Sequence, residues 1–223
     1  MEVTFCITCC DKDIHLLDSC LNYVRNQLTP PDEIVVVCSG LGQVSSNLME
    51  KMRKENVVFY NSPTRKLPGW ARNVGAMIST GEVVAFCDVD DAIHPNKCCI
   101  LKDVFKDSNV SALLHNYHLP NSFGGWELNN QLKFEVEEIT EEEPAPEPVP
   151  NGWFDIPRTN VMSPSRTPIH HGHISCRTEI FLSKAVAYDE DMSLGEDGTF
   201  CRSILHHPDY RLFYTPEKLI IYN

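Results

Sequence analysis

Three groups of polar residues in this chain have types and spacing that are suited to chemistry. The first is Phe86-Cys87-Asp88-Val89-Asp90-Asp91, an apolar run that leads directly into three carboxylates. Clustered carboxylates repel one another and resist removal from water, so a buried strand gains no stability from such an ending. Mg²⁺ or Mn²⁺ resolves the conflict, because these ions take oxygen ligands and are commonly shared with substrate phosphates. We expect Asp88 and Asp90 to face such an ion; an Asp-rich turn that caps the next helix is the alternative.

The second group lies upstream of Asp88, in Pro68-Gly69-Trp70-Ala71-Arg72-Asn73-Val74-Gly75-Ala76. The pattern predicts a helix with Arg72 and Asn73 on one face. The opposite, apolar face is expected to consist of Trp70, Val74, Met77 and Ile78. In a strand–helix–strand unit this helix lies beside the Asp-rich strand, so Arg72 would reach a bound diphosphate or the carboxylates themselves. A solvated arginine is the alternative.

The third group is Gly195-Glu196-Asp197-Gly198, at the start of a predicted helix. Acidic residues are favoured there by the helix dipole, which is a sufficient structural reason for the pair. A carboxylate that begins a helix beside a cleft can also act as a general base toward an attacking hydroxyl. The dipole keeps such a base ionised at neutral pH.

The elements that must position these groups alternate between strands and helices. Apolar runs predict strands at 2–8, 33–38, 57–60 and 82–87, and helical periodicity predicts helices at 13–27, 45–54 and 69–79. Further on we expect helices at 95–106, 178–184 and 196–205 and strands at 110–117 and 212–214. This order predicts an α/β fold with a mostly parallel sheet covered by helices on both faces. Such sheets bind ligands beyond the carboxyl ends of their strands.

Composition indicates a single globular domain over residues 1–223, with a net charge of −12. Part of the charge is concentrated in seven glutamates with no Lys or Arg between them, namely Glu135, Glu137, Glu138, Glu141, Glu142, Glu143 and Glu147. Together with alternating prolines at 144–150, they predict an exposed, variable excursion over residues 119–168. The chain lacks a basic surface, so nucleic acid is excluded as an expected partner.

The ten cysteines are expected to be reduced thiols, because the N-terminus does not resemble a signal peptide. No apolar run reaches the ~20 residues that cross a bilayer, so we expect a cytoplasmic protein without a transmembrane segment. Zinc is disfavoured: Cys6 and Cys9 lie three apart in a predicted strand and point to opposite faces, and Cys98 and Cys99 are neighbours on a predicted helix.

In this order, Ala71-Arg72-Asn73-x-Gly75, Asp88-x-Asp90-Asp91 and Glu196-Asp197 resemble the family 2 glycosyltransferases, inverting enzymes of the GT-A fold. The resemblance implies that Asp197 is the catalytic base, that Glu196 lies near the acceptor or donor sugar, and that Asp90 binds the metal directly. The residues implied in binding the donor nucleotide sugar are Thr8, Cys9, Asp11, Ser39, Arg72, Asn73, Asp88, Val89 and Asp90. The implied metal ligands are Asp90 and Asp88, with a late histidine from the His170–His173 group (His171 or His173 first) or, second, His207; His206 is a further candidate.

The resemblance implies transfer of a sugar from a nucleotide-sugar donor to an acceptor hydroxyl, with inversion and with Mn²⁺ or Mg²⁺. Residues 1–118 would bind the donor and residues 169–223 the acceptor, which is a glycan, a glycoprotein or another hydroxyl compound. A UDP-sugar is the default donor, although Cys38-Ser39-Gly40 stands where the family often carries acidic residues. A nucleotidyltransferase that makes nucleotide sugars, an inactive binding module, and a module of a larger glycosylation enzyme are the alternatives.

Overall fold

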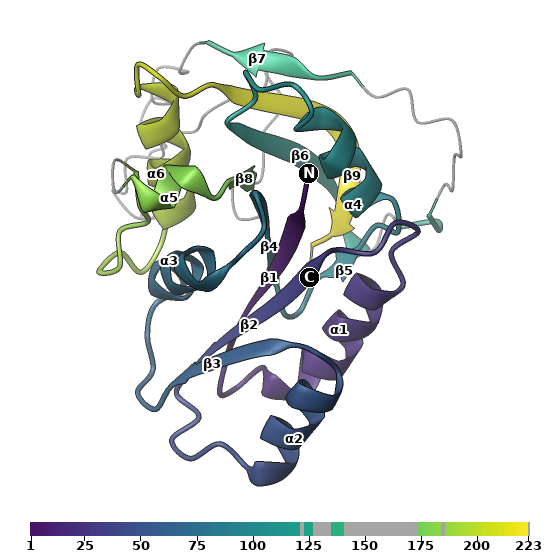
Figure 1. Cartoon of the computed structure of the whole chain (residues 1–223), viewed down its shortest axis with the longest axis vertical. Helices are drawn as coiled ribbons and strands as arrows, with labels where there is room; N and C mark the ends of the chain where they lie inside the picture. Colours follow the sequence, from purple (N-terminus) through teal and green to yellow (C-terminus); the bar gives the residue numbers. More distant parts are fainter. Residues whose placement is uncertain (121–122, 127–134, 141–173, 184–185, 223) are drawn as a thin grey trace, which may run out of the picture.

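A mixed nine-stranded sheet forms the centre of the computed structural model, which describes residues 1–120, 123–126, 135–140, 174–183 and 186–222 (Figure 1). Within these residues the strand order is β3-β2-β1-β4-β8-β6-β9-β5, and β7 also pairs with β9. The strands are β1 (Val3–Cys10), β2 (Glu33–Ser39), β3 (Val58–Ser62), β4 (Val83–Asp88), β5 (Ala92–Ile93), β6 (Ala112–His118), β7 (Glu137–Ile139), β8 (Ser175–Arg177) and β9 (Leu212–Ile221).

The predicted parallel sheet is confirmed in its first four strands. β1 lies between β2 and β4 and is parallel to both, and β3 is parallel to β2. β8 then runs antiparallel to β4 and β6, while β6 and β9 are parallel. The carboxyl ends of β1, β2 and β4 therefore meet at one edge of the sheet, where the acidic run after Phe86 begins.

Helices cover both faces of the sheet, as Figure 1 shows. The helices are η1 (Ile14–Leu16), α1 (Leu17–Arg25), α2 (Ser46–Lys54), α3 (Pro68–Ile78), α4 (Lys97–Val104), α5 (Glu179–Leu182) and α6 (Glu196–Leu205). Side chains of α1, α2 and α4 belong to one hydrophobic cluster, and those of α3, α5 and α6 belong to the other. The apolar run of β1 explains this division, because Phe5 and Ile7 join the first cluster and Cys6 the second.

The prediction for the buried face of α3 is wrong. Met77 is 65% exposed, and the helix instead buries its small and polar residues, among them Gly75, Ala76 and Arg72. The small residues allow α3 to approach the sheet closely: a Cβ on Gly75 would lie 2.1 Å from Sγ of Cys6 in β1. The apolar residues at helical spacing lie mostly on the half-buried side of α3. The small residues lie where α3 contacts the sheet.

Three short strands, β5, β7 and β8, were not predicted. β5 follows the acidic run directly and pairs with the end of β9, which is also longer than the predicted 212–214. β7 lies within the segment predicted to be an exposed excursion. Its Ile139 is 3% exposed and pairs with Leu212, so residues 137–139 belong to the sheet. The rest of the predicted excursion lies largely outside the described residues.

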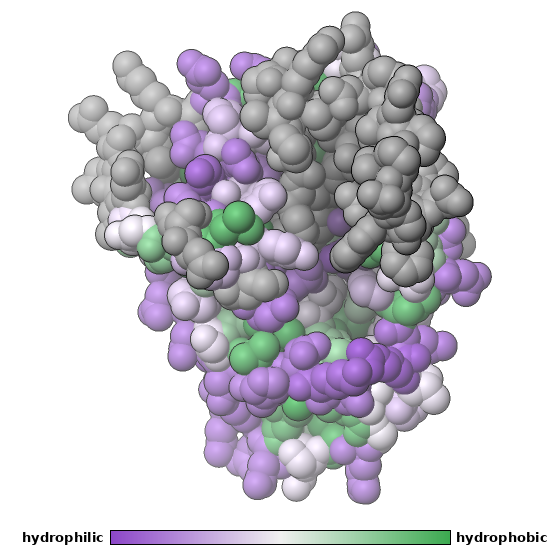
Figure 2. Space-filling model, turned by 180° about the vertical axis from the view of Figure 1, so that it is seen from behind, coloured by the Kyte–Doolittle hydropathy of each residue, from purple (hydrophilic) through white to green (hydrophobic). Residues whose placement is uncertain are grey.

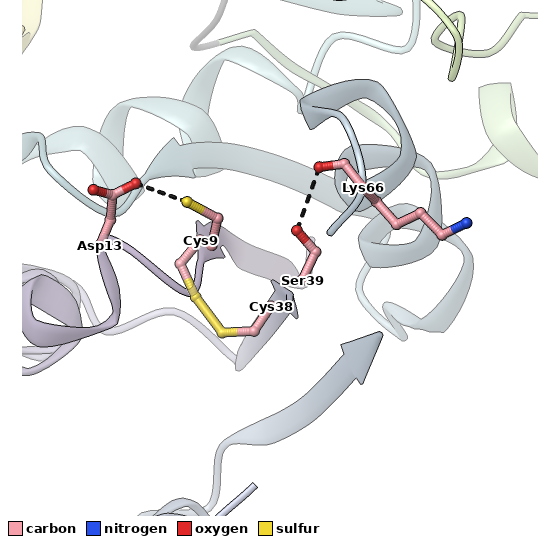
Figure 3. Close-up of a disulfide and its surroundings, with 6 residues drawn as sticks. Cys9, Asp13, Cys38, Ser39 and Lys66 are labelled. Atoms are coloured by element: carbon pink, nitrogen blue, oxygen red, sulfur yellow. Dashed lines mark hydrogen bonds between the residues drawn. A yellow bond between two sulfur atoms is a disulfide. The ribbon is translucent and has the colours of Figure 1, made fainter. Parts of the chain in front are cut away.

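Cys9 and Cys38 are joined by a disulfide, so the expectation that all cysteines are reduced is wrong for this pair (Figure 3). The register of β1 and β2 explains the pairing, because the two residues are direct neighbours across parallel strands. The other eight cysteines are free thiols, and Cys6 faces away from Cys9, as predicted.

The surface combines polar side chains with scattered apolar ones. On the side opposite to the view of Figure 1, hydrophilic side chains form a band across the lower half, with hydrophobic side chains above and below it (Figure 2). In the described part of the chain, none of the helices has the length and apolar character required to cross a membrane.

Candidate active site

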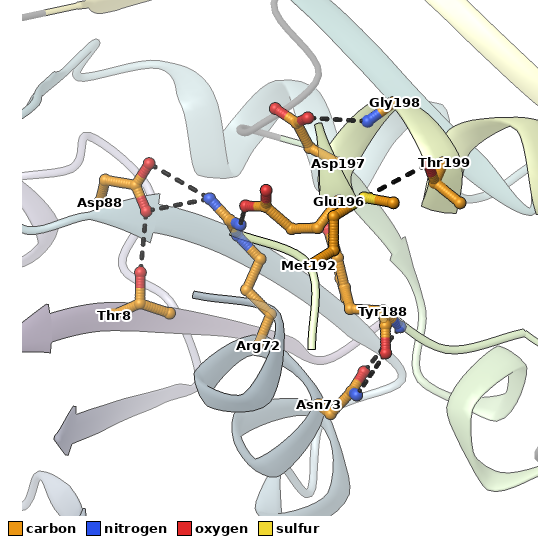
Figure 4. A network of polar contacts seen from close by, with 10 residues as sticks. All are labelled: Thr8, Arg72, Asn73, Asp88, Tyr188, Met192, Glu196, Asp197, Gly198 and Thr199. Carbon is orange, nitrogen blue, oxygen red and sulfur yellow. Dashed lines mark hydrogen bonds and ion pairs between the residues drawn. The ribbon is translucent and has the colours of Figure 1, made fainter. Parts of the chain in front are cut away.

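The three polar groups found in the sequence meet at the carboxyl end of β4. Arg72 of α3 lies between two carboxylates: its Nη1 donates to Oε1 of Glu196 at 2.7 Å, and its Nη2 lies 3.3 Å from both oxygens of Asp88. Thr8, at the end of β1, donates its hydroxyl to Asp88 Oδ1 at 2.8 Å. Figure 4 shows this chain of contacts across β1, β4, α3 and α6.

Arg72 is the centre of the group and is 3% exposed. Burial alone would lower its pKa, but the charges of Asp88 and Glu196 outweigh this and raise the pKa, so the guanidinium is a permanent cation. It also lies 5.4 Å from the ring centre of Tyr188, which stacks on Phe200. The expectation that Arg72 reaches the carboxylates is therefore confirmed, and most of its hydrogen-bonding capacity is used within the protein.

Asn73 holds the segment that leads to α6. Its Nδ2 donates to the carbonyl of Tyr188 at 2.9 Å and to Glu190, and its Oδ1 accepts from the N–H of Tyr188 at 2.9 Å. A side chain with both ends bonded in this way fixes the path of the backbone. Its predicted part in donor binding stays a prediction.

The acidic turn after β4 presents its carboxylates at different depths. Asp90 is exposed, Asp88 is half-buried, and Asp91 is only 2% exposed. The N–H of Asp91 donates to the carbonyl of Asp88 at 3.2 Å, which closes the turn. Partial burial, together with the charges of Asp91 and Asp88, raises the pKa of Asp90. The side chain of Val89 packs in the core, so a contact from this residue to a donor would come from its backbone.

The donor set of this turn fits a hard divalent cation held jointly with a substrate. Asp90 projects an exposed carboxylate beside like charges that a cation would relieve, and oxygen ligands suit Mg²⁺ and Mn²⁺. Among the described residues, no three His, Cys, Asp or Glu side chains form a complete metal cage. The remaining ligands would then come from the diphosphate, which is usual for these ions. Asp88, already bonded to Arg72 and Thr8, is the less available of the two carboxylates.

α6 presents Glu196 and Asp197 in different environments. Gly195 precedes the helix with φ at 83°, a conformation that favours glycine, and so turns the chain into the helix. Glu196 is 7% exposed and bonded to Arg72, whereas Asp197 is half-buried and accepts the N–H of Gly198 at 2.7 Å. Asp197 is therefore the less buried carboxylate of the pair, and Figure 4 shows both side chains.

Two of the segments predicted to bind the donor lie side by side at the ends of β1 and β2. The N–H of Asp11 donates to the carbonyl of Ser39 at 3.0 Å. Figure 3 shows the hydroxyl of Ser39, which lies 3.4 Å from the carbonyl of Lys66. Asp11 is exposed, while Ser39 and Cys9 are nearly buried. Because Cys9 is bonded to Cys38, it has no thiol to offer a ligand.

The predicted histidine ligands are not brought to this site within the described part of the chain. His170, His171 and His173 lie outside the described residues. His207 follows the far end of α6 from Asp197, where its ring stacks on Tyr210 at 4.1 Å and accepts the N–H of Asp209. A helix of ten residues is about 15 Å long, so His207 is remote from the acidic turn.

Two residues beside the acidic turn were missed. Tyr222 follows Ile221, which pairs with Ala92, and its N–H donates to the carbonyl of His118 at 2.9 Å. Burial and the negative charges of Asp91, Asp88 and Asp90 raise the pKa of this phenol. Lys97, at the start of α4, is fully buried; burial lowers its pKa, while Cys87, Asp91 and Asp88 act in the opposite direction. No motif marks either residue; only the pairing of β5 with β9 and the packing of α4 bring them here.

Comparisons with known proteins agree with this fold. The mannosyltransferase PcManGT from Pyrobaculum calidifontis, solved with GDP-Man and Mn²⁺, matches 99% of this chain with a TM-score of 0.63 at 16% identity, over 56% of its own chain. S. aureus TarS 1-349 in complex with UDP-GlcNAc matches 98% of this chain with a TM-score of 0.62 at 17% identity, over 59% of its own chain. The fold is thus that of the GT-A glycosyltransferases.

Sequence comparison identifies the family of glycosyltransferases to which the chain belongs. The model of glycosyl transferase family 2 matches residues 4–166, and the chain belongs to this family. The uncharacterized glycosyltransferase alr2836 of Nostoc sp. is 31% identical over 108 residues, which cover 45% of this chain and 32% of that protein. The chain thus spans less than two thirds of the length of the proteins that it matches.

Proposed function

We propose that this protein transfers a sugar from a nucleotide sugar, with a UDP-sugar as the first candidate, to an acceptor hydroxyl with inversion at the anomeric carbon. The observation that carries the proposal is the ion-paired path from Asp88 through Arg72 to Glu196, which joins the acidic turn to the start of α6. This arrangement puts a candidate metal ligand, Asp90, and a candidate base, Asp197, on elements that are held rigidly to each other. The relatives are glycosyltransferases, which favours transfer over nucleotide-sugar synthesis.

The position of each residue suggests its role in the proposed reaction. Thr8 and Asp11 at the end of β1 and Ser39 at the end of β2 would contact the nucleoside, and Asp90 would hold Mn²⁺ or Mg²⁺ against the diphosphate. A divalent cation in this position neutralises the charge that develops on the departing diphosphate. Asp197 would accept the proton of the acceptor hydroxyl as its oxygen attacks.

Glu196 and Arg72 have a positioning role in this proposal. Both side chains are buried and form an ion pair with each other, so neither is available to an acceptor. The acceptor, which is a glycan, a glycoprotein or another hydroxyl compound, would approach from the side of α6 and β9, next to Tyr222. Residues 1–118 would bind the donor and residues 169–223 the acceptor, either as a complete enzyme or as a module of a larger glycosylation protein. The cytoplasmic location expected from the sequence stays a prediction.

The test is a thermal-shift titration with UDP, GDP, dTDP and CMP, each with and without Mn²⁺. Wild type is compared with Asp90→Ala and with Asp103→Ala, a matched change at an exposed aspartate that pairs with Lys106. Binding at a hundredfold excess over Kd raises the apparent stability by about 2.7 kcal/mol. We expect a Mn²⁺-dependent shift with one nucleotide that Asp103→Ala retains and Asp90→Ala loses. No shift of the wild type with any nucleotide would refute the proposal.

A further inference from the structure

Lys97 is a charged side chain enclosed in the protein without a direct partner. It opens α4, its exposed fraction is 0%, and its Nζ has no hydrogen bond within the described chain. A buried ammonium without a partner costs several kcal/mol unless other charges offset the loss of water. Its presence therefore calls for an electrostatic explanation from its surroundings.

The surroundings of Lys97 are the inner side of the acidic turn. Burial lowers the pKa of Lys97, while Cys87 at the end of β4, Asp91 and Asp88 act in the opposite direction. The N–H of Lys97 donates to the carbonyl of His94 at 3.0 Å, so the start of α4 is fixed to the segment that follows the turn. Asp91 is almost as deeply buried as Lys97, whereas Asp90 is exposed on the outer side. Lys97 and Asp91 thus lie on the buried side of the turn, and Asp90 lies on its exposed side.

Arg72 and Lys97 approach the turn from opposite faces of the sheet. Arg72 belongs to α3, in one hydrophobic layer, and contacts Asp88 directly. Lys97 belongs to α4, in the other layer, and acts on the turn only through space. Because Lys97 makes no hydrogen bond that would orient a carboxylate, its effect on the site is that of charge.

We propose that Lys97 is a positioning residue, a fixed internal counter-charge beneath residues 88–91 that sets the balance between metal and diphosphate binding. The proposal rests on the function proposed above, because it concerns the same site. A buried positive charge repels a divalent cation bound at Asp90 and attracts the negative diphosphate of the donor. It therefore keeps the metal weakly bound until the nucleotide arrives, and it supports the nucleotide before the metal arrives.

The opposite signs of these two effects provide the test. Binding of Mn²⁺ alone, and of UDP and GDP without metal, is measured by isothermal calorimetry for wild type, Lys97→Met and Lys106→Met. Lys106 is an exposed lysine beyond the end of α4 and is the matched control. Loss of one buried unit charge beside the site should change each affinity by roughly tenfold. We expect Lys97→Met to bind Mn²⁺ about tenfold more tightly and the metal-free nucleotide about tenfold more weakly, with Lys106→Met unchanged.

A purely structural role for Lys97 predicts something else, namely that both affinities fall together because the site is distorted. That outcome, or unchanged affinities in Lys97→Met, overturns the inference and leaves the proposed function standing. If wild type binds neither Mn²⁺ nor nucleotide, the proposed function fails and the inference fails with it.

A double variant covers the case in which Lys97→Met does not fold. Asp91→Asn combined with Lys97→Met removes one buried charge of each sign, so it should fold with a Tm closer to wild type than Lys97→Met alone. Circular dichroism during heating measures the Tm of both variants. If the double variant is no more stable than the single one, Lys97 is required for packing rather than for charge, and the inference is overturned.

Discussion

The guanidinium of Arg72 lies 2.7 Å from the carboxylate of Glu196, although 124 positions separate the two residues in the sequence. Both are buried, and the contact joins α3 of the first half of the sheet to α6 of the second. Because Arg72 also contacts Asp88, it determines how far the acidic turn lies from the start of α6. The stability and the chemistry of the site therefore depend on one side chain.

Replacing Arg72 by Met should destabilise the protein by about 3–5 kcal/mol, because Asp88 and Glu196 would be left close together without their cation. Arg72→Lys should recover only part of this loss, since an ammonium cannot span both carboxylates as a guanidinium does. Urea denaturation measures the effect. Arg53→Met, a change at an exposed arginine on α2, is the control and should cost less than about 0.5 kcal/mol. Equal losses in the two Met variants would contradict the role of Arg72.

Gly75→Ala tests the close approach of α3 to β1. The added methyl would lie 2.1 Å from Sγ of Cys6, so the helix or the strand must shift. We expect a loss of about 1–3 kcal/mol, which is typical of overpacking. Removing the sulfur in Gly75→Ala/Cys6→Ala should recover part of it, whereas Met77→Ala on the exposed side of the same helix should have little effect. A double variant as unstable as the sum of its single changes would show that the two residues do not meet.

The regular part of the fold could be predicted from local pattern. The run at residues 34–37 and the alternation around Phe5 mark buried strands, and α6 begins at Glu196, as its acidic start indicates. Strand order and the pairing of β5 with β9 depend on contacts between distant residues, and short strands such as β7 carry too few residues to form a pattern.

The motifs of the site could be predicted from the sequence, but the contacts between their side chains could not. Asp88, Arg72 and Asp197 were chosen by type and spacing, and the structure brings their elements together. Arg72 was predicted to reach a diphosphate or the carboxylates. The structure shows it bonded to Asp88 and to Glu196, a partner that the sequence does not indicate, and its part in donor binding stays a prediction. Lys97 was missed because a lysine next to a polar segment is ordinarily exposed, and only packing shows that α4 encloses it.

The disulfide between Cys9 and Cys38 predicts a specific count of reactive thiols. Alkylation of the unfolded, non-reduced protein should label eight of the ten cysteines, and reduction should make all ten available. Mass spectrometry reads the count directly. Breaking the cross-link should lower stability by about 3 kcal/mol, because the unfolded chain gains freedom. Labelling of all ten cysteines without reductant, in protein purified without reducing agent, would show that the bond does not form.

Tyr222 is expected to affect the acceptor more than the nucleotide. It lies next to the acidic turn at the end of β9, and its ring contacts Tyr117 at 5.9 Å between centroids. Tyr222→Ala should lower kcat/KM for the acceptor by about tenfold through lost aromatic contact area, while Tyr222→Phe should retain most of it. Nucleotide binding, followed by thermal shift, should be unchanged in both. A loss of nucleotide binding in Tyr222→Phe would place the phenol in the donor site instead.

Glu196 and Asp197 are adjacent, yet their isosteric variants should fail in different ways. Asp197→Asn removes the accessible base, so kcat should fall by about 10²–10⁴-fold while nucleotide binding and Tm stay near wild type. Glu196→Gln leaves the buried Arg72 with one neutral partner, so the Tm should fall first and activity should fall with it. Product formation and thermal unfolding, measured on the same preparations, separate the two. If Glu196→Gln abolishes transfer at an unchanged Tm and Asp197→Asn remains active, then the catalytic base is Glu196, and the Arg72 ion pair must open during the reaction.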